Sequence, residues 1–190
     1  MMKKILTLAF VLVITGAFAN NNPIKKMKIN TEESSVNWVG KKVTGSHTGT
    51  LSFLEGYLEM DGDNITGGKF VVDMTTLQVT DLQAGRGKEK LEGHLNSPDF
   101  FGVEENPTAT FEITEAAKSG DHYSVMGDLT IKGHTESMKI RLSVNGNTAS
   151  TTLNVDRTKF GIRYGSASFF DGLKNKAINN EFELNINLVM

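Results

Sequence analysis

The chain of 190 residues contains no cysteine and only three prolines. Without a thiol it has no disulfide framework, no thiolate nucleophile and no cysteine for an N-terminal lipid anchor. Runs of basic residues are also absent, and the formal charge is −2. A mildly acidic chain of this kind argues against nucleic acid as a partner and against general attraction to anionic membranes. No internal repeat is present, so we expect one domain with its own apolar core.

One long apolar run does occur, near the N-terminus. Lys3 and Lys4 precede an apolar stretch over residues 5–18, and the small residues Ala17 and Ala19 flank Phe18 as in a signal-peptidase site. The run is shorter than the roughly 20 residues that a membrane-spanning helix needs. We therefore expect a signal peptide over residues 1–19, cleaved after Ala19.

Cleavage at that site has three consequences. Loss of the two lysines changes the formal charge from −2 to −4. The product is expected to be periplasmic or secreted, without stable membrane insertion. Residues 20–28 are predicted to be a leader, and residues 29–190 to form the domain.

Alternation of apolar and polar residues dominates the rest of the chain. Every second residue over 138–144 is apolar, and the same spacing recurs over 149–155 and 182–188. A period of two is typical of strands with one buried face. Short turns rich in Gly, Asn and Asp separate the strands, which favours antiparallel neighbours. We predict an all-β fold, an antiparallel up-and-down barrel of about eight strands, because closure removes exposed edges. A two-sheet sandwich is the alternative, which alternation does not separate from the barrel.

One segment has helical spacing instead. Leu91 and Leu95 recur at i and i+4, and Pro98 disfavours helix at the residue before it. Phe100 and Phe101 follow directly and need a buried environment. This pattern predicts a short helical lid that presses two aromatic rings against one end of the barrel.

Several motifs follow one another from this helix to the C-terminus. They are GHL at 93–95, SPDFF at 97–101, PTATF at 107–111, GDLTIKG at 127–133 and DRTKFGI at 156–162. Together they resemble the YceI-like family of exported, lipocalin-like barrels that bind polyisoprenoids, over residues from about Met27 to the end of the chain. The preference for the barrel over the sandwich rests mainly on this resemblance. The resemblance implies a long-chain isoprenoid lipid, quinone-like or polyprenyl, inside the barrel, and it is compatible with a homodimer. Gly102, where an acidic residue is expected, and Asn106, where an aromatic residue is expected, depart from the family pattern.

Periodicity does not distinguish a hollow barrel from a filled one, since both occur at about eight strands. Small residues at Gly49, Gly127, Ala149 and Thr151 share strand faces with large ones, which either leaves room near the axis or accommodates the barrel's taper. The resemblance favours a cavity. We expect its apolar wall to be formed by Trp38, Phe53, Phe70, Phe100, Phe101, Phe111, Ile131, Leu142, Leu153, Phe160, Phe182 and Leu184.

Polar residues near the helix are candidates for contact with a lipid head group. Arg86 and Lys88 flank Gly87 just before the helix, where backbone N–H groups and positive charge suit a phosphate or phenolic group. A solvated loop is the alternative. His94 either donates to a lipid oxygen or forms a hydrogen bond with a neighbouring loop carbonyl.

The DRTKFGI motif offers a further polar pair. Asp156 and Arg157 are neighbours on a predicted strand, so they should point to opposite faces. Each is then expected to find a cross-strand partner. The motif alone does not make Arg157 a ligand contact.

No pattern in the chain indicates catalysis. The four histidines lack metal-type spacing, and Ser46 does not stand in a nucleophile elbow. We expect no metal and no cofactor, and a binding protein, carrier or sequestering module, rather than an enzyme. Two alternatives stay open: an enzyme of isoprenoid or quinone metabolism that uses His94 and a loop carboxylate, and a structural stress protein with a filled barrel.

Overall fold

The computed structural model describes residues 23–190. Its elements, in chain order, are β1 (Lys25–Lys28), β2 (Ser35–Lys42), β3 (Gly45–Asp61), β4 (Asn64–Val79), α1 (Lys88–Asn96), β5 (Thr108–Ser119), β6 (His122–Ile131), β7 (His134–Asn145), β8 (Thr148–Asp156), the 3-10 helices η1 (Arg157–Phe160) and η2 (Lys174–Lys176), and β9 (Ile178–Val189). The predicted signal peptide, residues 1–19, lies outside the described residues.

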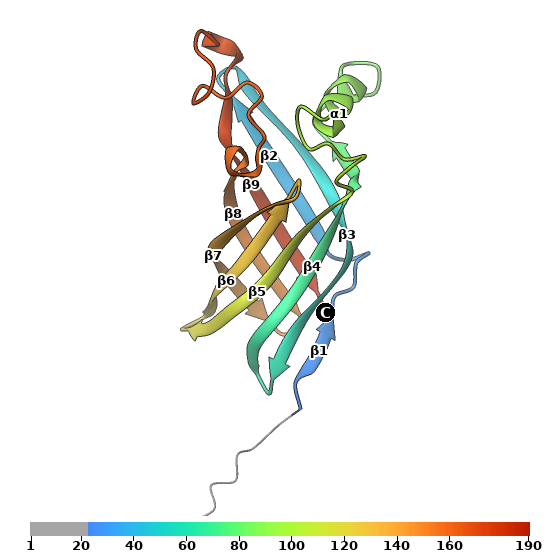
Figure 1. The fold of residues 1–190 in the computed structure, drawn as a ribbon. Coiled ribbons are helices and arrows are strands. Elements are labelled where there is room, and N and C mark those ends of the chain that lie inside the picture. The colour runs from blue at the N-terminus through green and yellow to red at the C-terminus, as the bar shows by residue number, and fades with distance from the viewer. Residues whose placement is uncertain (1–22) are drawn as a thin grey trace, which may run out of the picture.

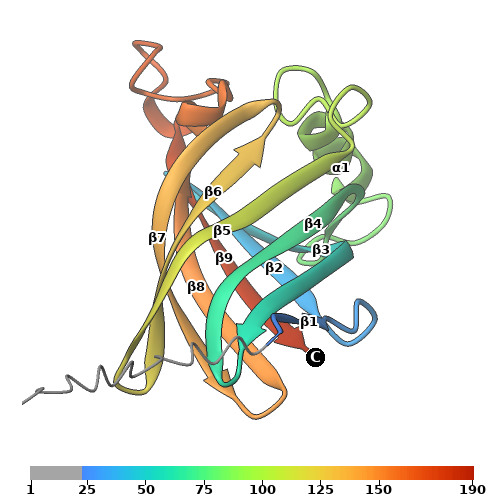
Figure 2. The same ribbon diagram turned by 60° about the horizontal axis from the view of Figure 1, so that its bottom comes forward.

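Strands β2 to β9 form a closed barrel (Figures 1 and 2). Each pairs antiparallel with the next strand along the chain, from β2–β3 through to β8–β9. The barrel closes where β2 pairs with β9, with Trp38 opposite Leu184. Each of the eight strands therefore has a partner on both sides. The predicted up-and-down barrel with a short helix is confirmed, and the two-sheet sandwich is wrong.

A short additional strand corrects one boundary. Residues 25–28, predicted to belong to a leader, form β1 and pair with β3, from Lys25 opposite Met60 to Lys28 opposite Tyr57. Three lysines in four residues gave no alternation from which a strand could be predicted. The strand forms because β3, with 17 residues, extends beyond its pairing with β2 and offers a free edge there.

Apolar side chains from the inward faces of the strands, and from α1 and the loops at its end of the barrel, form two clusters. One lies at the end covered by α1 and includes Trp38, Leu95 and Phe100. The other lies further along the barrel and includes Phe53 and Leu188. Both clusters follow the alternation seen in the sequence, which places every second residue of a strand on the inner face.

Two of the small residues on the inner face make room for large neighbours. A Cβ atom at Gly49 would collide with the Trp38 ring and the Gln78 carbonyl, and one at Gly127 would collide with the Phe111 ring. These glycines therefore do not open the cavity. Their role is the accommodation of barrel geometry, because each lets an aromatic ring lie flat against the sheet.

Candidate functional site

An apolar cavity of about 160 Å³ lies inside the barrel. Its wall takes Leu95 and Phe100 from the cluster beneath α1 and Phe53, Leu142 and Leu188 from the other cluster, so the cavity is elongated along the barrel. Cavities of this size lined by aliphatic and aromatic groups stay dry and accept apolar molecules. The interior is hollow, which contradicts the filled barrel considered as an alternative.

All but one of the residues predicted for the wall line this cavity. They are Trp38, Phe53, Phe70, Phe100, Phe101, Phe111, Ile131, Leu142, Leu153, Phe182 and Leu184. Phe160 lies on η1, after the end of β8, and is buried in the same cluster as Leu95 and Phe100 without lining the cavity. Contact of the other residues with a ligand stays a prediction.

The charged lining residues and the one amide gather at one end of the cavity. Lys41 lies near the end of β2, and Asn179 and Glu181 lie near the start of β9. All three are exposed, and the two strands pair at this point, with Gly40 opposite Phe182. The cavity therefore reaches the surface at the end of the barrel where β2 ends and β9 begins. We call this opening the mouth.

Arg157 is a buried cation at the mouth, with 2% of the residue exposed. Its Nε donates to the Asn179 carbonyl at 3.0 Å, its Nη1 to the Ile162 carbonyl at 2.8 Å and its Nη2 to the Ile178 carbonyl at 3.1 Å. Burial lowers the pKa of Arg157, and the nearby Asp156 carboxylate partly opposes that shift. The guanidinium thus joins η1 and the chain after it to the start of β9.

The expectation for the Asp156 and Arg157 pair was right only in part, because Arg157 does contact β9, the strand that pairs with β8, but it is not on a strand itself. Asp156 Oδ1 accepts the backbone N–H of Thr158 at 2.9 Å and the Thr158 hydroxyl at 2.6 Å, which starts η1. Arg157 is therefore on a 3-10 helix rather than on a strand, and its partners are main-chain carbonyls. The sequence signal for this was the Asp-x-Thr spacing, which is typical of a turn that begins with a side-chain cap.

The lid covers the cavity with aromatic rings. Phe100 and Phe101, in the turn after α1, line the cavity beside Leu95. The Phe101 ring centroid lies 6.3 Å from that of Phe182 on β9, and Arg157 Cζ lies 5.7 Å from the Phe100 centroid. These contacts connect the lid to the side of the barrel that carries the mouth.

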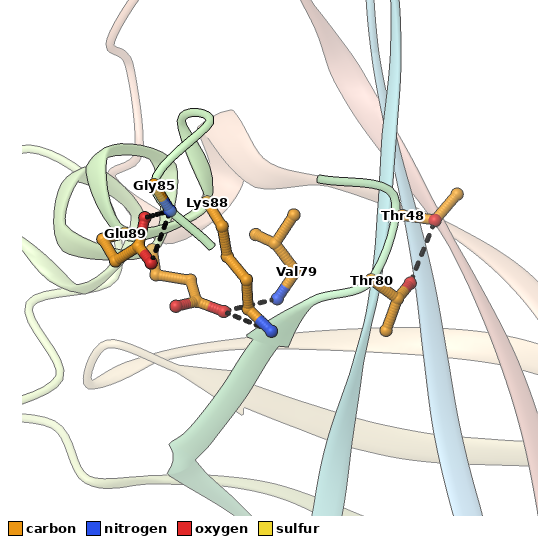
Figure 3. A network of polar contacts seen from close by, with 7 residues as sticks. Thr48, Val79, Thr80, Gly85, Lys88 and Glu89 are labelled. Atoms are coloured by element: carbon orange, nitrogen blue, oxygen red, sulfur yellow. Dashed lines mark hydrogen bonds and ion pairs between the residues drawn. The ribbon is translucent and has the colours of Figure 1, made fainter. Parts of the chain in front are cut away.

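Polar contacts hold α1 against the end of β4 (Figure 3). Glu92 Oε1 accepts the backbone N–H of Val79 at 2.8 Å and lies 3.8 Å from Lys88 Nζ. The Glu89 carboxylate accepts the backbone N–H of Gly85. Two carboxylates of α1 therefore hold the helix against the preceding chain. The Lys88 ammonium lies beside one of them, the Glu92 carboxylate, within the helix itself.

The predicted head-group residues do not line the cavity. Arg86 is exposed in the turn before α1, and Lys88 pairs with Glu92. The His94 ring packs edge-on against Phe100 and Tyr164, with centroid distances of 5.7 and 4.4 Å. Aromatic packing, not the expected hydrogen bond to a loop carbonyl, positions this ring.

Two cations line the cavity, Lys41 and Arg157. Sequence reasoning singled out Arg157 without assigning it to the cavity, and it missed Lys41. From the sequence pattern alone, Lys41 is an ordinary solvent-exposed lysine that follows the apolar part of its strand. Its position at the mouth depends on the pairing of β2 with β9, whose residues are far apart in the chain. No local pattern carries that information.

The two departures from the family pattern act together in the lid. Gly102 has a φ of 56°, a left-handed conformation that favours glycine. Its carbonyl accepts the Asn106 backbone N–H at 2.9 Å and the Asn106 side-chain amide at 3.1 Å. The pair therefore forms a closed turn beneath the lid in place of an acidic and an aromatic residue.

A carboxylate after β4 links the lid side of the barrel to β3. Asp81 accepts the Thr48 backbone N–H at 2.9 Å and lies 2.8 Å from His47 Nδ1. Burial by itself would raise the pKa of Asp81, but these hydrogen bonds outweigh burial and lower that pKa. Its stabilisation is therefore present above the unfolded-state pKa and lost as the pH falls through the lower, folded-state pKa.

We expect Asp81→Asn to lower the free energy of unfolding at pH 7 by up to about 1 kcal/mol. In strong acid the variant and the native protein should be equally stable, because Asp81 is then protonated. Urea unfolding at both pH values measures the difference, with the exposed Asp99→Asn as the control. A difference of the same size at both pH values would contradict this prediction.

Within residues 23–190, no helix is long and apolar enough to cross a bilayer. No group of three or more His, Asp or Glu side chains in this part of the chain is placed to hold a metal ion.

A closed up-and-down barrel around an apolar cavity with a mouth at one end defines a lipocalin-like architecture. Residues 27–190 match the YceI-like domain. The chain therefore belongs to the YceI-like family, as its motifs indicated.

Similar proteins agree with this assignment. A UPF0312 protein of Pseudomonas aeruginosa is 36% identical over 98 residues, which are 52% of this chain and 49% of that protein. A UPF0312 protein of Pectobacterium atrosepticum is 34% identical over 98 residues, 52% of this chain and 48% of that protein. The chain spans about half the length of the curated relatives it matches.

Solved structures show the same fold. The crystal structure of Burkholderia cenocepacia BcnA matches with a TM-score of 0.68 and 22% identity, covering 85% of this chain and 99% of that one. A polyisoprenoid binding domain from Saccharophagus degradans matches with a TM-score of 0.61 and 12% identity, covering 87% and 97%. At these identities the likeness concerns the fold alone.

Proposed function

We propose that this protein is exported and binds a long isoprenoid chain in the barrel cavity, as a carrier or sequestering module. The observation that carries the proposal is the elongated cavity, whose wall away from the mouth is aliphatic and aromatic apart from Thr110 and Thr151. Membership of the YceI-like family supports it, as does the likeness to a protein described as a polyisoprenoid binding domain.

The position of the polar lining orients the ligand. Lys41, Arg157 and Asn179 lie at the mouth, whereas Phe53, Leu142 and other apolar residues line the interior. A chain with one polar end therefore fits with its tail inside and its head group at the mouth. Quinone-like and polyprenyl lipids have this form.

The free energy of burying the lipid tail is consistent with a carrier rather than with an enzyme. Burial is worth roughly 0.8 kcal/mol per CH₂ relative to water, so one five-carbon unit contributes about 3 kcal/mol. Eight such units would exceed the practical affinity limit of about 18 to 21 kcal/mol. The lipid comes from a membrane and not from water, so its transfer between two apolar environments has a small net driving force. Reversible exchange follows from that balance.

The structure does not favour the enzyme alternative. His94, its proposed catalytic group, packs between Phe100 and Tyr164, and its buried Nε2 has no hydrogen-bond partner among the described residues. A general base needs a partner that orients it and access to the substrate. His94 does not line the cavity.

Obstruction of the cavity tests the proposal. Thr151 lines the cavity from β8, and its buried hydroxyl has no partner in the described structure. We expect Thr151→Phe to weaken uptake of a fluorescent polyprenyl probe by at least about tenfold, because the ring occupies the space of the chain. Mass spectrometry of a solvent extract should also show less copurified lipid.

Thr151→Val is the matched control. It keeps the volume and removes the unpaired hydroxyl, so it should keep probe uptake and raise the free energy of unfolding by about 1 kcal/mol. A second obstructing variant, Ala109→Leu on the wall formed by β5, guards against a folding defect at one position. Normal uptake by both obstructing variants, with normal unfolding curves, would contradict lipid binding in this cavity.

A further inference from the structure

Exposed apolar side chains gather beside the mouth. Six large apolar residues of the described chain are prominently exposed, and four of them lie here. Tyr164, Phe169 and Phe170 are 48%, 47% and 51% exposed in the loop between η1 and β9, and Val43 is 62% exposed in the turn between β2 and β3. Large apolar groups concentrated on one part of a surface indicate an interaction site.

The loop and the turn form one surface. The Val43 backbone N–H donates to the Ala177 carbonyl at 3.2 Å, and Lys42 pairs with Ile178 across β2 and β9. Figure 1 shows the loop, in orange-red, beside the turn that joins β2 to β3, at the end of the barrel that carries α1. We call residues 41–44 and 163–177 together the mouth tip.

The mouth tip is an ordered structure. Ser166 is fully buried, and its Oγ donates to Asn180 Oδ1 at 2.6 Å. The backbone N–H groups of Phe169 and Phe170 both donate to the Ser166 carbonyl, at 3.1 and 3.0 Å. The two rings are therefore held on a hydrogen-bonded turn anchored to β9, and they project outward although burial would favour the reverse.

Positive charge surrounds these rings. The mouth tip contains five exposed basic residues, Lys41, Lys42, Arg163, Lys174 and Lys176, against one acidic residue, Asp171. The whole chain, by contrast, has a formal charge of −2. Arg163 Cζ lies 4.7 Å from the Phe169 ring centroid, so basic and aromatic groups are adjacent. Charge and aromatic rings are thus concentrated together on the same small surface.

We propose that the mouth tip docks on an anionic lipid surface. Aromatic rings suit the boundary between acyl chains and head groups, and lysines beside them attract anionic phosphates. The net charge of the whole chain predicts no general attraction to anionic membranes. Salt screens charges more than about 10 Å apart, however, so at contact the positive charge of the mouth tip determines the attraction to the bilayer. Lys41 belongs to both the mouth tip and the cavity lining, so docking places the mouth against the bilayer.

Vesicle flotation with the full chain tests this proposal. We expect binding to vesicles of phosphatidylcholine mixed with phosphatidylglycerol, and weaker binding to phosphatidylcholine alone or at high salt. The double variant F169S/F170S should reduce binding to the anionic vesicles by at least about tenfold, and K174E/K176E should remove the preference for them.

Matched controls lie away from the mouth. Leu54→Ser removes an apolar side chain that is 58% exposed on β3, and Lys118→Glu reverses an exposed charge near the hairpin of β5 and β6. Both should bind vesicles as the native protein does. Equal loss in the controls, undiminished binding by both mouth-tip variants, or failure of the native protein to bind any vesicle would overturn the proposal.

The same variants separate docking from cavity binding. None of the four substituted mouth-tip residues lines the cavity, so uptake of the polyprenyl probe without vesicles should stay normal. Normal probe uptake without vesicle binding would refute docking and leave the proposed function standing. Vesicle binding without probe uptake would contradict lipid binding in the cavity and leave the docking proposal standing.

Discussion

Gly49→Ala should lower the free energy of unfolding by about 3 kcal/mol or more, a large effect for a single methyl group. Gly49 lies on β3 opposite Trp38 on one side and Val79 on the other. The added Cβ would collide with both the Trp38 indole and the Gln78 carbonyl. The carbonyl is part of the backbone of β4, and the indole is buried in the core, so neither moves without disturbing the barrel.

Guanidinium unfolding followed by tryptophan fluorescence measures this effect, because Trp38 is the single tryptophan of the chain. Gly93→Ala is the matched control. A Cβ at Gly93 on α1 meets open space, and alanine is the better helix former, so that variant should be as stable as the native protein or more stable by up to about 1 kcal/mol. A loss below about 1 kcal/mol in Gly49→Ala would show that the indole rearranges freely.

Arg157→Met should lower the free energy of unfolding by about 3 kcal/mol, because it leaves three main-chain carbonyls at the mouth without their donors. The loss should be concentrated at the start of β9, where Ile178 and Asn179 supply two of those carbonyls. Faster amide hydrogen exchange at the first residues of β9 would show that the stability is lost there, and the denaturation midpoint of the same variant would give the size of the loss.

Two comparisons isolate the cause. Lys159→Met removes a nearby exposed cation, 3.8 Å from Glu136, and should cost less than about 1 kcal/mol. Arg157→Lys keeps the charge but not the planar fork that reaches three acceptors, so it should lose most of the same stability. A lysine variant as stable as the native protein would show that the charge matters and the fork does not.

Alternation in the sequence accounts for the strands and for which side chains face inward, whereas the choice of a closed, hollow barrel rested mainly on the resemblance to the YceI-like family. A period of two fixes which side chains face inward once a strand is recognised, and Leu153, Phe182 and Leu184 were assigned correctly to the wall in this way. Phe160 was expected on the wall because it follows the end of a predicted strand, but it lies on η1 and is buried in the core without lining the cavity.

Other features depend on contacts that no local pattern encodes. β1 was missed because its residues are mostly lysine and its partner edge exists only through the length of β3. The role of Gly49 depends on where the Trp38 ring lies across the sheet. The mouth lies where the end of β2 meets the start of β9, from opposite ends of the domain, so Lys41 could not be assigned to it from the sequence.

The position of β1 has a practical consequence. It pairs with the part of β3 remote from the mouth, and the Met190 backbone N–H bonds to Asn147 in the hairpin of β7 and β8. Figure 1 shows β1 and the C-terminus at the end of the barrel away from α1. An affinity tag, a fluorescent fusion or a solid support joined to the C-terminus would therefore leave the entrance of an immobilised molecule facing outward and accessible to added lipid.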